Sequence, residues 1–442
     1  LEFEKDYPEA RVVKLEQNYR TTGRILSAAG RVIGNNVDRK PKTLWTSNPP
    51  GENVRYCRVP DEHAEAAFVC DQVERLGEEG IAPGGVAVFY RTHAQSRVIE
   101  EHLVRRGVSY RVFGGTRFYD RQEIKDTVAY LRLLANPRDE VSLRRIVNVP
   151  ARGIGKSTLA GLDEHSRRTG RPLIDCVRSA GEVPGLSPRA VRSLGDFARM
   201  IDGLALYADG HDVDELLEEV WDSTGYLADL EAQKSLEAEG RVENLKELHG
   251  AVAEFRREYG AVSLDDFLER VSLVSDTDNL EDGACVSLMT LHNAKGLEFD
   301  GVFMVGMEER VFPHARSLEN SRDLEEERRL CYVGMTRARR VLYVTHAEAR
   351  SLWGGLSLNR VSRFLEEVPP DLLEAVEYAP PRPEGGRDRL AVGEGDVVVH
   401  AKWGEGLVLS LVELENDCEI TVEFKSVGKK RMLMSYAPLS LP

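Results

Sequence analysis

Two kinds of hydrophobic pattern alternate along residues 11–113. Stretches with apolar residues at helical spacing, at 22–33, 64–76 and 96–106, separate short runs of strand character at 11–15, 54–59, 85–90 and 110–113. The run at 85–90 is almost wholly apolar, which is typical of a strand buried on both faces of a parallel sheet. The order of these segments predicts a series of βαβ units.

The pattern changes after Gly114 and Gly115. From residue 120 to about 281, long amphipathic stretches predict helices, and strand-like runs return at 286–291, 302–306 and 341–344. We therefore predict an α/β fold with a parallel-sheet domain, residues 1–119 and 282–368, which is split by an inserted helical domain at 120–281. Proline and glycine mark 369–394 as a linker. Strand-like runs at 396–400, 407–409 and 419–424 then predict a small β-barrel at 395–442.

Composition narrows the function classes. A net charge of −15 argues against a uniformly basic nucleic-acid coat, so any DNA contact must come from a local site. The six cysteines are scattered without a C-x-x-C pair, and we predict neither disulfides nor a metal site. No apolar run reaches membrane-spanning length and no leader opens the chain, so we expect a cytoplasmic protein without a membrane partner. The chain begins with Leu1 instead of Met, which indicates a fragment.

The stretch PARGIGKST at 150–158 ends like a P-loop. A P-loop requires glycine where Pro150 stands, because backbone N–H groups must fold around the phosphates, and proline lacks an N–H. The preceding residues 142–147 also predict an amphipathic helix instead of a buried strand. We therefore do not expect this stretch to bind nucleotide phosphate.

Tyr19 and Arg20 stand between a predicted strand and a predicted helix. That position places them at the carboxyl edge of the sheet, where open α/β sheets bind ligands. A tyrosine there can stack on a base, and an arginine can reach a phosphate with two hydrogen bonds. The alternative is a helix entry capped by Thr21 or Thr22, with Arg20 in solvent.

A second polar stretch, residues 290–300, lies between two predicted buried strands. Loops that a rigid scaffold holds in place often carry function. His292 and Lys295 suit a nucleic-acid backbone, and Glu298 suits a ribose hydroxyl. The alternative is a solvated crossover loop.

The third stretch is EEERRLCYVGMTRARR at 325–340. Glu325–Glu327 suit a helix N-terminus, while Arg339 and Arg340 suit its C-terminus, so the helix dipole explains most of this charge. Arg337 differs because it falls on the helical face of Leu330. An arginine on an inward face needs an anionic partner, and a phosphate would satisfy it.

In this order and around this insertion, the three stretches resemble the UvrD/PcrA/Rep family of superfamily 1 DNA helicases. LEQNYRTTGRIL resembles the family's motif IV, VSLMTLHNAKGLEFDGVFMVGMEE its motif V and EEERRLCYVGMTRAR its motif VI. YRTHAQSR and GGTRFYDRQEIKDTVAYLRLLANP resemble the motifs that follow motif IV, and NVPARGIGKSTL resembles a hairpin segment of the inserted helical domain. The resemblance covers nearly the whole chain.

The resemblance implies a RecA-like domain, called 2A, split by a helical domain, called 2B. Tyr19 would stack on adenine, Glu298 would contact the ribose, and the catalytic arginines Arg20 and Arg337 would approach the γ-phosphate. The remaining implied contacts are with DNA: single-stranded DNA at Arg91, His93, His292 and Lys295, and duplex DNA at Arg152, Gly153, Gly155 and Lys156.

Two positions depart from the family pattern. His93 stands where relatives commonly have asparagine, and Arg310 stands where many have glycine. The sequence also contains no P-loop and no apolar strand ending in an Asp-Glu pair. The resemblance is therefore to the C-terminal half of an ATP-dependent 3′–5′ helicase of DNA repair or replication. ATP and Mg²⁺ would be bound mainly by the other half, and this chain alone would be inactive.

Two rival classes remain. One is a non-enzymatic module that tethers DNA or RNA polymerase, for which two arginines facing a nucleotide would have no use. The other is a helicase with a nuclease domain, which is disfavoured because no carboxylate-and-lysine cluster follows Pro369. The C-terminal unit around Trp403 is similar to the Tudor-like barrel that docks on RNA polymerase in some of these helicases. Its 429–431 cluster of Lys and Arg would suit nucleic acid equally.

Overall fold

The computed structural model describes residues 7, 9, 13–37, 44–259, 263–275, 284–352, 355–378, 392–400, 404–413, 418–425, 428–433 and 439–440. The chain forms two compact units, 1–378 and 379–442. Within the described residues, no helix has the length and apolar character needed to cross a membrane.

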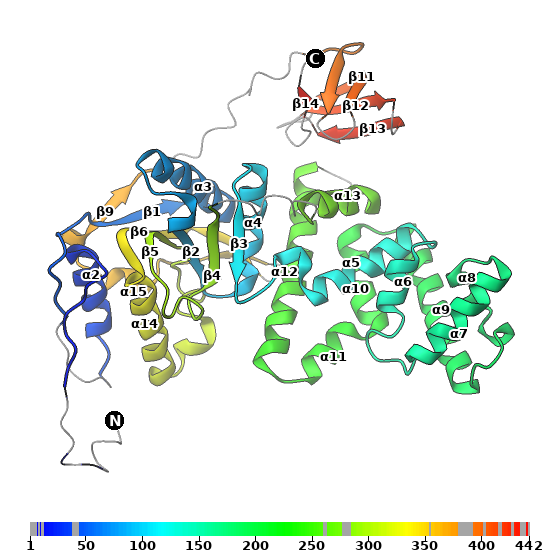
Figure 1. Ribbon diagram of the computed structural model, residues 1–442, viewed down its shortest axis with the longest axis horizontal. Coiled ribbons are helices and arrows are strands. Elements are labelled where there is room, and N and C mark those ends of the chain that lie inside the picture. Colours follow the sequence, from blue (N-terminus) through cyan, green and yellow to red (C-terminus); the bar gives the residue numbers. More distant parts are fainter. Residues whose placement is uncertain are drawn as a thin grey trace. The chain divides into compact units, whose positions relative to one another are not determined.

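A seven-stranded sheet forms the centre of the first unit (Figure 1). Its order is β3-β4-β2-β5-β6-β1-β9, and all neighbouring strands are parallel. Every residue of β2 and β4 is buried, as the continuous apolar runs predict. The strands are β1 (Val54–Val59), β2 (Val86–Tyr90), β3 (Tyr110–Phe113), β4 (Val286–Thr290), β5 (Phe299–Met304), β6 (Ala338–Ala347) and β9 (Leu373–Val376).

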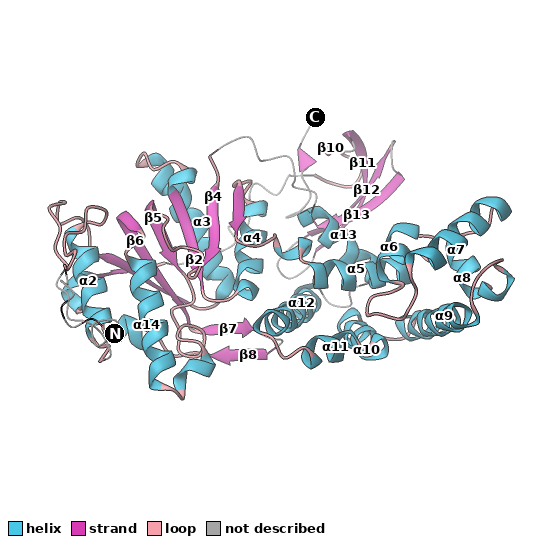
Figure 2. Ribbon diagram, turned by 60° about the horizontal axis from the view of Figure 1, so that its bottom comes forward, coloured by secondary structure: helices cyan, strands magenta, loops and turns pink. Residues whose placement is uncertain are grey.

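Helices cover both faces of this sheet (Figure 2). The helices α3 (Glu62–Glu78) and α4 (Ser96–Arg105) pack on one face, where Val88 and Tyr90 point. The helices α2 (Gly23–Gly34) and α14 (Ser321–Met335) pack on the other, where Ala87 and Phe89 point. Because side chains alternate along a strand, one apolar run supplies both cores. The short hairpin β7 (Ala349–Leu352) and β8 (Gly355–Leu358) and the helix α15 (Arg363–Glu366) follow β6.

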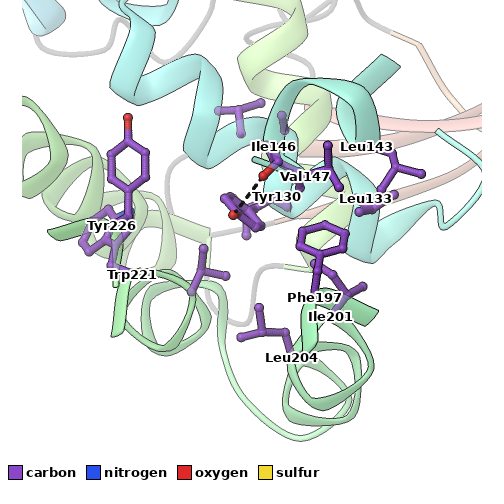
Figure 3. Close-up of a cluster of buried hydrophobic side chains, with 14 of the residues drawn as sticks. Tyr130, Leu133, Leu143, Ile146, Val147, Phe197, Ile201, Leu204, Trp221 and Tyr226 are labelled. Carbon is purple, nitrogen blue, oxygen red and sulfur yellow. Dashed lines mark hydrogen bonds between the residues drawn. The ribbon is translucent and has the colours of Figure 1, made fainter. Parts of the chain in front are cut away.

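The predicted insertion is helical. Between β3 and β4 lie α5 (Gln122–Ala135), α6 (Glu140–Ile146), α7 (Lys156–Thr169), α8 (Leu173–Arg178), α9 (Pro188–Ala208), α10 (Val213–Thr224), α11 (Tyr226–Ala232), α12 (Leu236–Tyr259) and α13 (Leu264–Ser275). These helices share a hydrophobic core that is separate from the two sheet cores, with Phe197 and Trp221 among its large side chains (Figure 3). Within it, the Tyr130 hydroxyl donates to the Ile146 carbonyl at 3.4 Å (Figure 3).

The second unit is a five-stranded antiparallel sheet of order β13-β12-β11-β10-β14. Its strands are β10 (Val397–His400), β11 (Gly404–Glu413), β12 (Cys418–Phe424), β13 (Gly428–Leu433) and β14 (Leu439–Ser440). A small core of Val398, Val408, Ile420, Val422 and Phe424 holds it together. Trp403 and the side chains of the last two residues of the 429–431 cluster lie outside the described residues.

Three local expectations differ from the structure. Val13 and Leu15 form no strand and are 68% and 78% exposed, while residues 11 and 12 lie outside the described residues. A strand needs a neighbour, and the pairing near this segment is a single bridge between Gln17 and Trp45. The composition at 369–394 predicts a linker, yet β9 forms within it and pairs with β1.

The third difference concerns α14. This helix begins at Ser321, where the Asn320 side chain accepts a hydrogen bond from the Arg322 N–H, and it ends at Met335. The glutamates at 325–327 are therefore in mid-helix, and Arg337 lies in the turn between α14 and β6, not on a helical face. The capping asparagine, which satisfies a free N–H of the first turn, sets the start.

Candidate nucleotide and nucleic-acid sites

The candidate residues fall at two opposite edges of the sheet. Glu298 and Arg337 directly precede β5 and β6, two strands in which Phe299 pairs with Ala338, so both lie at the amino edge. Arg91 and the turn containing His292 follow β2 and β4 directly, so they lie at the carboxyl edge. The sequence alone assigned neither Glu298 nor Arg337 to an edge of the sheet.

Arg20 is held at the amino edge by a turn. The Asn18 side chain accepts hydrogen bonds from the N–H groups of Arg20 and Thr21 at 2.8 and 2.9 Å. The Thr22 N–H donates to the Arg339 carbonyl at 3.3 Å, which fixes this turn beside the start of β6. Placement of Tyr19 and Arg20 at the carboxyl edge was therefore wrong, because the described residues 13–16 that precede them form no strand. Thr22 does occupy the N-cap of α2, but its side chain makes no capping bond.

Arg20 and Glu298 form an ion pair across this edge. The Arg20 Nε lies 2.6 Å from Glu298 Oε2, and its Nη1 lies 3.5 Å from the Thr336 carbonyl. The hydrogen bond from Arg20 lowers the pKa of the Glu298 carboxyl. Both side chains remain partly open to solvent, so the pair can be exchanged for contacts to a ligand.

Arg337 lies beside this pair without a carboxylate of its own. Its Nε donates to the Val333 carbonyl at 2.9 Å and its Nη1 to the Leu297 carbonyl at 3.2 Å. Along the described parts of the chain it forms no ion pair, and burial together with the nearby Arg20 charge lowers the pKa of its guanidinium. Two arginines with one carboxylate leave a local positive charge that suits an anion.

Tyr19 presents its ring to solvent at the same edge. The residue is 75% exposed, and its hydroxyl donates to the Gln17 side chain at 2.7 Å. An exposed aromatic ring next to two arginines is suited to stacking on a planar base.

At the carboxyl edge, Arg91 pairs with Glu327 of α14. Its Nε and Nη2 lie 2.7–3.0 Å from the two carboxylate oxygens, and Glu327 also accepts the His314 N–H at 3.0 Å. Glu327 was not among the site residues predicted from the sequence. Consecutive residues of a helix point in directions about 100° apart, so three glutamates in a row cannot all face solvent. The run at 325–327 could therefore have indicated that one of them faces inward and needs a partner.

His292 and Lys295 are exposed in the turn that follows β4. Although His292 is exposed, partial loss of hydration beside its neighbours, and then the charge of Arg91, lower its pKa. Leu291 and Ala294 of the same turn are anchored in the sheet core. Glycine at 114 allows this turn to pack closely against the chain that follows β3. Its φ is 71°, and a Cβ there would come within 2.2 Å of the Asn293 side-chain nitrogen.

His93 is partly buried behind this turn. Burial, and then the charge of Arg121, lower its pKa to about 4, so its ring is neutral at pH 7. Its Nδ1 is buried without a hydrogen-bond partner in the described structure. A neutral ring can hydrogen-bond to DNA but brings no positive charge to a phosphate.

In the PARGIGKST segment, residues 150–155 belong to the connection between α6 and α7, and residues 156–158 begin α7. A helix therefore precedes this segment, where a P-loop has a buried strand. The Asn148 side chain accepts the N–H groups of Arg152 and Ile154, and Gly153 takes a φ of 74°. The Arg152 guanidinium turns inward: it donates to the Val149 carbonyl at 2.9 Å and to the Tyr130 hydroxyl at 2.8 Å. Gly153, Gly155 and Lys156 are exposed at the N-terminus of α7.

The families that match this sequence agree with the architecture described above. The family model described as UvrD-like helicase C-terminal domain matches residues 13–183 and 203–349, and the PcrA/UvrD tudor domain matches 394–440. The ATP-dependent DNA helicase PcrA of Bacillus subtilis is 43% identical over 473 residues, covering 99% of this chain and 64% of that protein. The proteins of the same name from Staphylococcus epidermidis and Staphylococcus aureus are 39% and 40% identical, covering 100% and 99% of this chain.

The chain spans 63–64% of the length of these relatives. The first family match alone extends over more than half of the chain and includes both edges of the sheet described above. The chain therefore belongs to the UvrD-like helicases, of which it comprises the C-terminal domain followed by a PcrA/UvrD-type tudor domain.

Proposed function

We propose that this chain is the C-terminal part of an ATP-dependent DNA helicase or translocase of the PcrA type, which moves 3′ to 5′ on single-stranded DNA in repair or replication. The observation that carries the proposal is the arrangement of Arg20 and Arg337 at the amino edge of the sheet. One carboxylate, Glu298, accompanies the two guanidinium groups, and Arg337 has no ion pair in the described structure.

In this proposal the amino edge faces ATP. Tyr19 stacks on adenine, Glu298 accepts a ribose hydroxyl, and Arg20 and Arg337 contact the γ-phosphate. Negative charge spreads over the phosphoryl oxygens in the transition state, and such arginines accelerate transfer by about 10³–10⁵. The lowered pKa of Arg337 supports this role, because the guanidinium is held partly dehydrated next to a second positive charge.

The phosphates and Mg²⁺ need further groups. The sequence contains no G-x-x-x-x-G-K-[ST] loop. In the proposed enzyme, a P-loop and a Mg²⁺-binding acidic pair therefore belong to protein outside residues 1–442, and this chain alone does not hydrolyse ATP at a useful rate. Closure of the two parts on ATP brings the arginines to the γ-phosphate.

The carboxyl edge faces single-stranded DNA through Arg91, His93, His292 and Lys295. The hairpin with Gly153, Gly155 and Lys156 faces the duplex backbone, while Arg152 shapes that hairpin from inside. The exposed N-terminus of α7 supports the duplex contact, because free N–H groups at a helix start suit phosphates. The tudor-like unit docks on RNA polymerase in this proposal.

The test compares DNA-stimulated ATP hydrolysis by this chain, by the full-length protein and by its Arg337→Ala variant. We expect activity from the full-length protein, none from the chain alone, and a loss of at least about 10³-fold in Arg337→Ala with nucleotide still bound. Arg339→Ala, at an exposed side chain near the start of β6, is the control and should stay active. Unchanged turnover in Arg337→Ala would instead favour a non-enzymatic tether.

A further inference from the structure

A second polar cluster lies where the sheet region meets the helical insertion. Glu62 and His63 open α3, and Glu254 lies on α12. One ligand atom from each of these side chains lies within 4.8 Å of the others. The His63 Nε2 is 3.5 Å from Glu254 Oε2. An imidazole nitrogen and carboxylate oxygens at such spacing are ligands that Zn²⁺ accepts.

Each carboxylate in the cluster keeps one oxygen open. Glu62 Oε1 accepts the Ser351 N–H at 2.8 Å, and Glu254 Oε2 accepts the Arg97 Nη2 at 3.0 Å. Neither second oxygen has a hydrogen bond within the described structure. A cation can therefore be bound while the contacts to Ser351 and Arg97 remain, and it takes the place of the His63–Glu254 contact.

The surroundings carry more negative than positive charge. Arg97 is 1% exposed and already binds three carboxylates, and Arg270 lies 3.3 Å from one of them. With His63 neutral, as metal binding requires, the carboxylates Glu62, Glu101 and Glu254 outnumber the guanidinium groups of Arg97 and Arg270. Glu247 adds only part of a charge, because burial raises its pKa to about 7. The neighbouring Arg350 does not offset this excess of negative charge, because it already forms ion pairs with both Glu65 and Glu308. Excess charge in a partly buried region is unfavourable, and a divalent cation would neutralise it.

A separate observation points to the same place. The ring of His102, on α4, lies 5.8 Å from the ring of His63. Its Nε2 is buried and has no hydrogen-bond partner in the described residues. Buried polar atoms without a partner are rare, and here the atom belongs to an imidazole ring that neighbours His63.

We propose that Glu62, His63 and Glu254 form a binding site for a divalent transition-metal ion, with His102 as a nearby fourth donor and zinc as the fitting ion. A site with imidazole ligands disfavours Mg²⁺, which prefers oxygen ligands and retains its water. Because α3 belongs to the sheet region and α12 to the insertion, the bound ion ties the two regions together. The ion plays no part in ATP hydrolysis.

The test is zinc binding to this chain after treatment with a chelator, measured by calorimetry and by competition with a chromogenic chelator. We expect one zinc ion per chain, an increase in Tm on binding, and no comparable effect of Mg²⁺. His63→Gln should weaken binding at least tenfold. Glu62→Gln should do the same while its amide oxygen still accepts the Ser351 N–H.

The control is His249→Gln. Within the described residues, His249 pairs with one carboxylate, Glu218, at 3.1 Å and belongs to no group of three candidate ligands. It should bind zinc as the unmodified chain does. The proposal is overturned if the unmodified chain binds no stoichiometric zinc, or if zinc binds equally to the His63→Gln chain, since the ion is then held elsewhere. Metal-free Tm values of the three variants show whether they are folded.

Discussion

Arg91 and Glu327 lie 236 residues apart in the sequence and form a paired salt bridge with N–O distances of 2.7–3.0 Å. Their side chains are only 19% and 7% exposed. The bridge joins the end of β2 to α14, the helix that leads to Arg337. A phosphate that approaches Arg91 must therefore compete with a carboxylate that is already in place.

From this salt bridge we predict that Glu327→Gln strengthens binding to single-stranded DNA. Removing the carboxylate charge frees the Arg91 guanidinium for a phosphate, while the amide oxygen still accepts the His314 N–H. The slope of log K against log salt should steepen by about 0.7, the value for one added phosphate contact on single strands. Fluorescence anisotropy with an oligonucleotide at several salt concentrations measures it.

The matched control for that experiment is Glu326→Gln. Glu326 lies on the same helix but is exposed and pairs with Arg329. Its removal should leave the salt slope unchanged. Weaker binding by Glu327→Gln would mean that the bridge positions Arg91 for DNA instead of competing with it.

Arg310→Gly should stabilise the first unit by about 0.5–1 kcal/mol. Arg310 has a φ of 75°, a left-handed conformation that is strained for an arginine and free of strain for glycine. Its backbone carbonyl accepts the Ala315 N–H, so the loop keeps its shape without the side chain. Urea denaturation measures the change. Arg310→Ala retains the strain and should show no such gain.

His93 should make stability fall in acid. The pKa of His93 is about 4 in the folded chain, below the ordinary value of 6.5, so the unfolded chain binds more protons between these pH values. Keeping this ring neutral contributes of the order of 2 kcal/mol to the free energy of unfolding. This contribution is complete above pH 6.5 and is lost as the pH falls from 6.5 to 4.

The measurement is denaturant unfolding of the wild-type and His93→Asn chains at pH 7.5, 5.5 and 4.5. The difference in unfolding free energy between them should move in favour of His93→Asn as the pH falls. His211→Asn, at an exposed imidazole, should keep the wild-type pH dependence. A pH-independent difference between wild type and His93→Asn would refute this assignment.

Arg152 and Lys156 are close in sequence but should respond differently to substitution. Arg152→Ala removes hydrogen bonds to partly buried carbonyls and the packing over the Phe197 ring, and should cost about 2–4 kcal/mol of stability. Lys156→Ala should leave Tm nearly unchanged and lower the salt slope of duplex binding by about 0.9. Thermal unfolding and anisotropy distinguish the two. An unchanged Tm in Arg152→Ala would refute the structural role.

The regular parts of the fold were predictable from periodicity. A buried apolar run such as 86–90 permits few alternatives, and the strands predicted at 54–59 and 110–113 form with the same bounds. The segment at 11–15 shows why a pattern alone is insufficient: strand character describes the residues, whereas a strand also needs an edge to pair with. Residues 373–376 show the opposite: their sequence only weakly predicts a strand, yet they form β9 because the free edge of β1 is there to pair with.

The candidate sites depend on side-chain partners that sequence does not reveal. Nothing in the sequence around Arg152 distinguishes a guanidinium that turns inward from one that faces solvent. The same holds for Arg91, whose partner Glu327 is distant in the chain. The edge assignment of Tyr19 and Arg20 failed for a simpler reason, because the strand predicted at 11–15 does not form at the described residues 13–15.

The strands β3 and β4 are neighbours in the sheet, although the whole helical insertion separates them in sequence. Their alignment requires residues 114–285 to bring the two ends together, and the entropic cost of closing so long a disordered loop is high until the insertion is compact. We therefore expect this edge of the sheet to form late during folding. In refolding followed by hydrogen exchange, amides of the helical core should become protected before those of the β3–β4 pair.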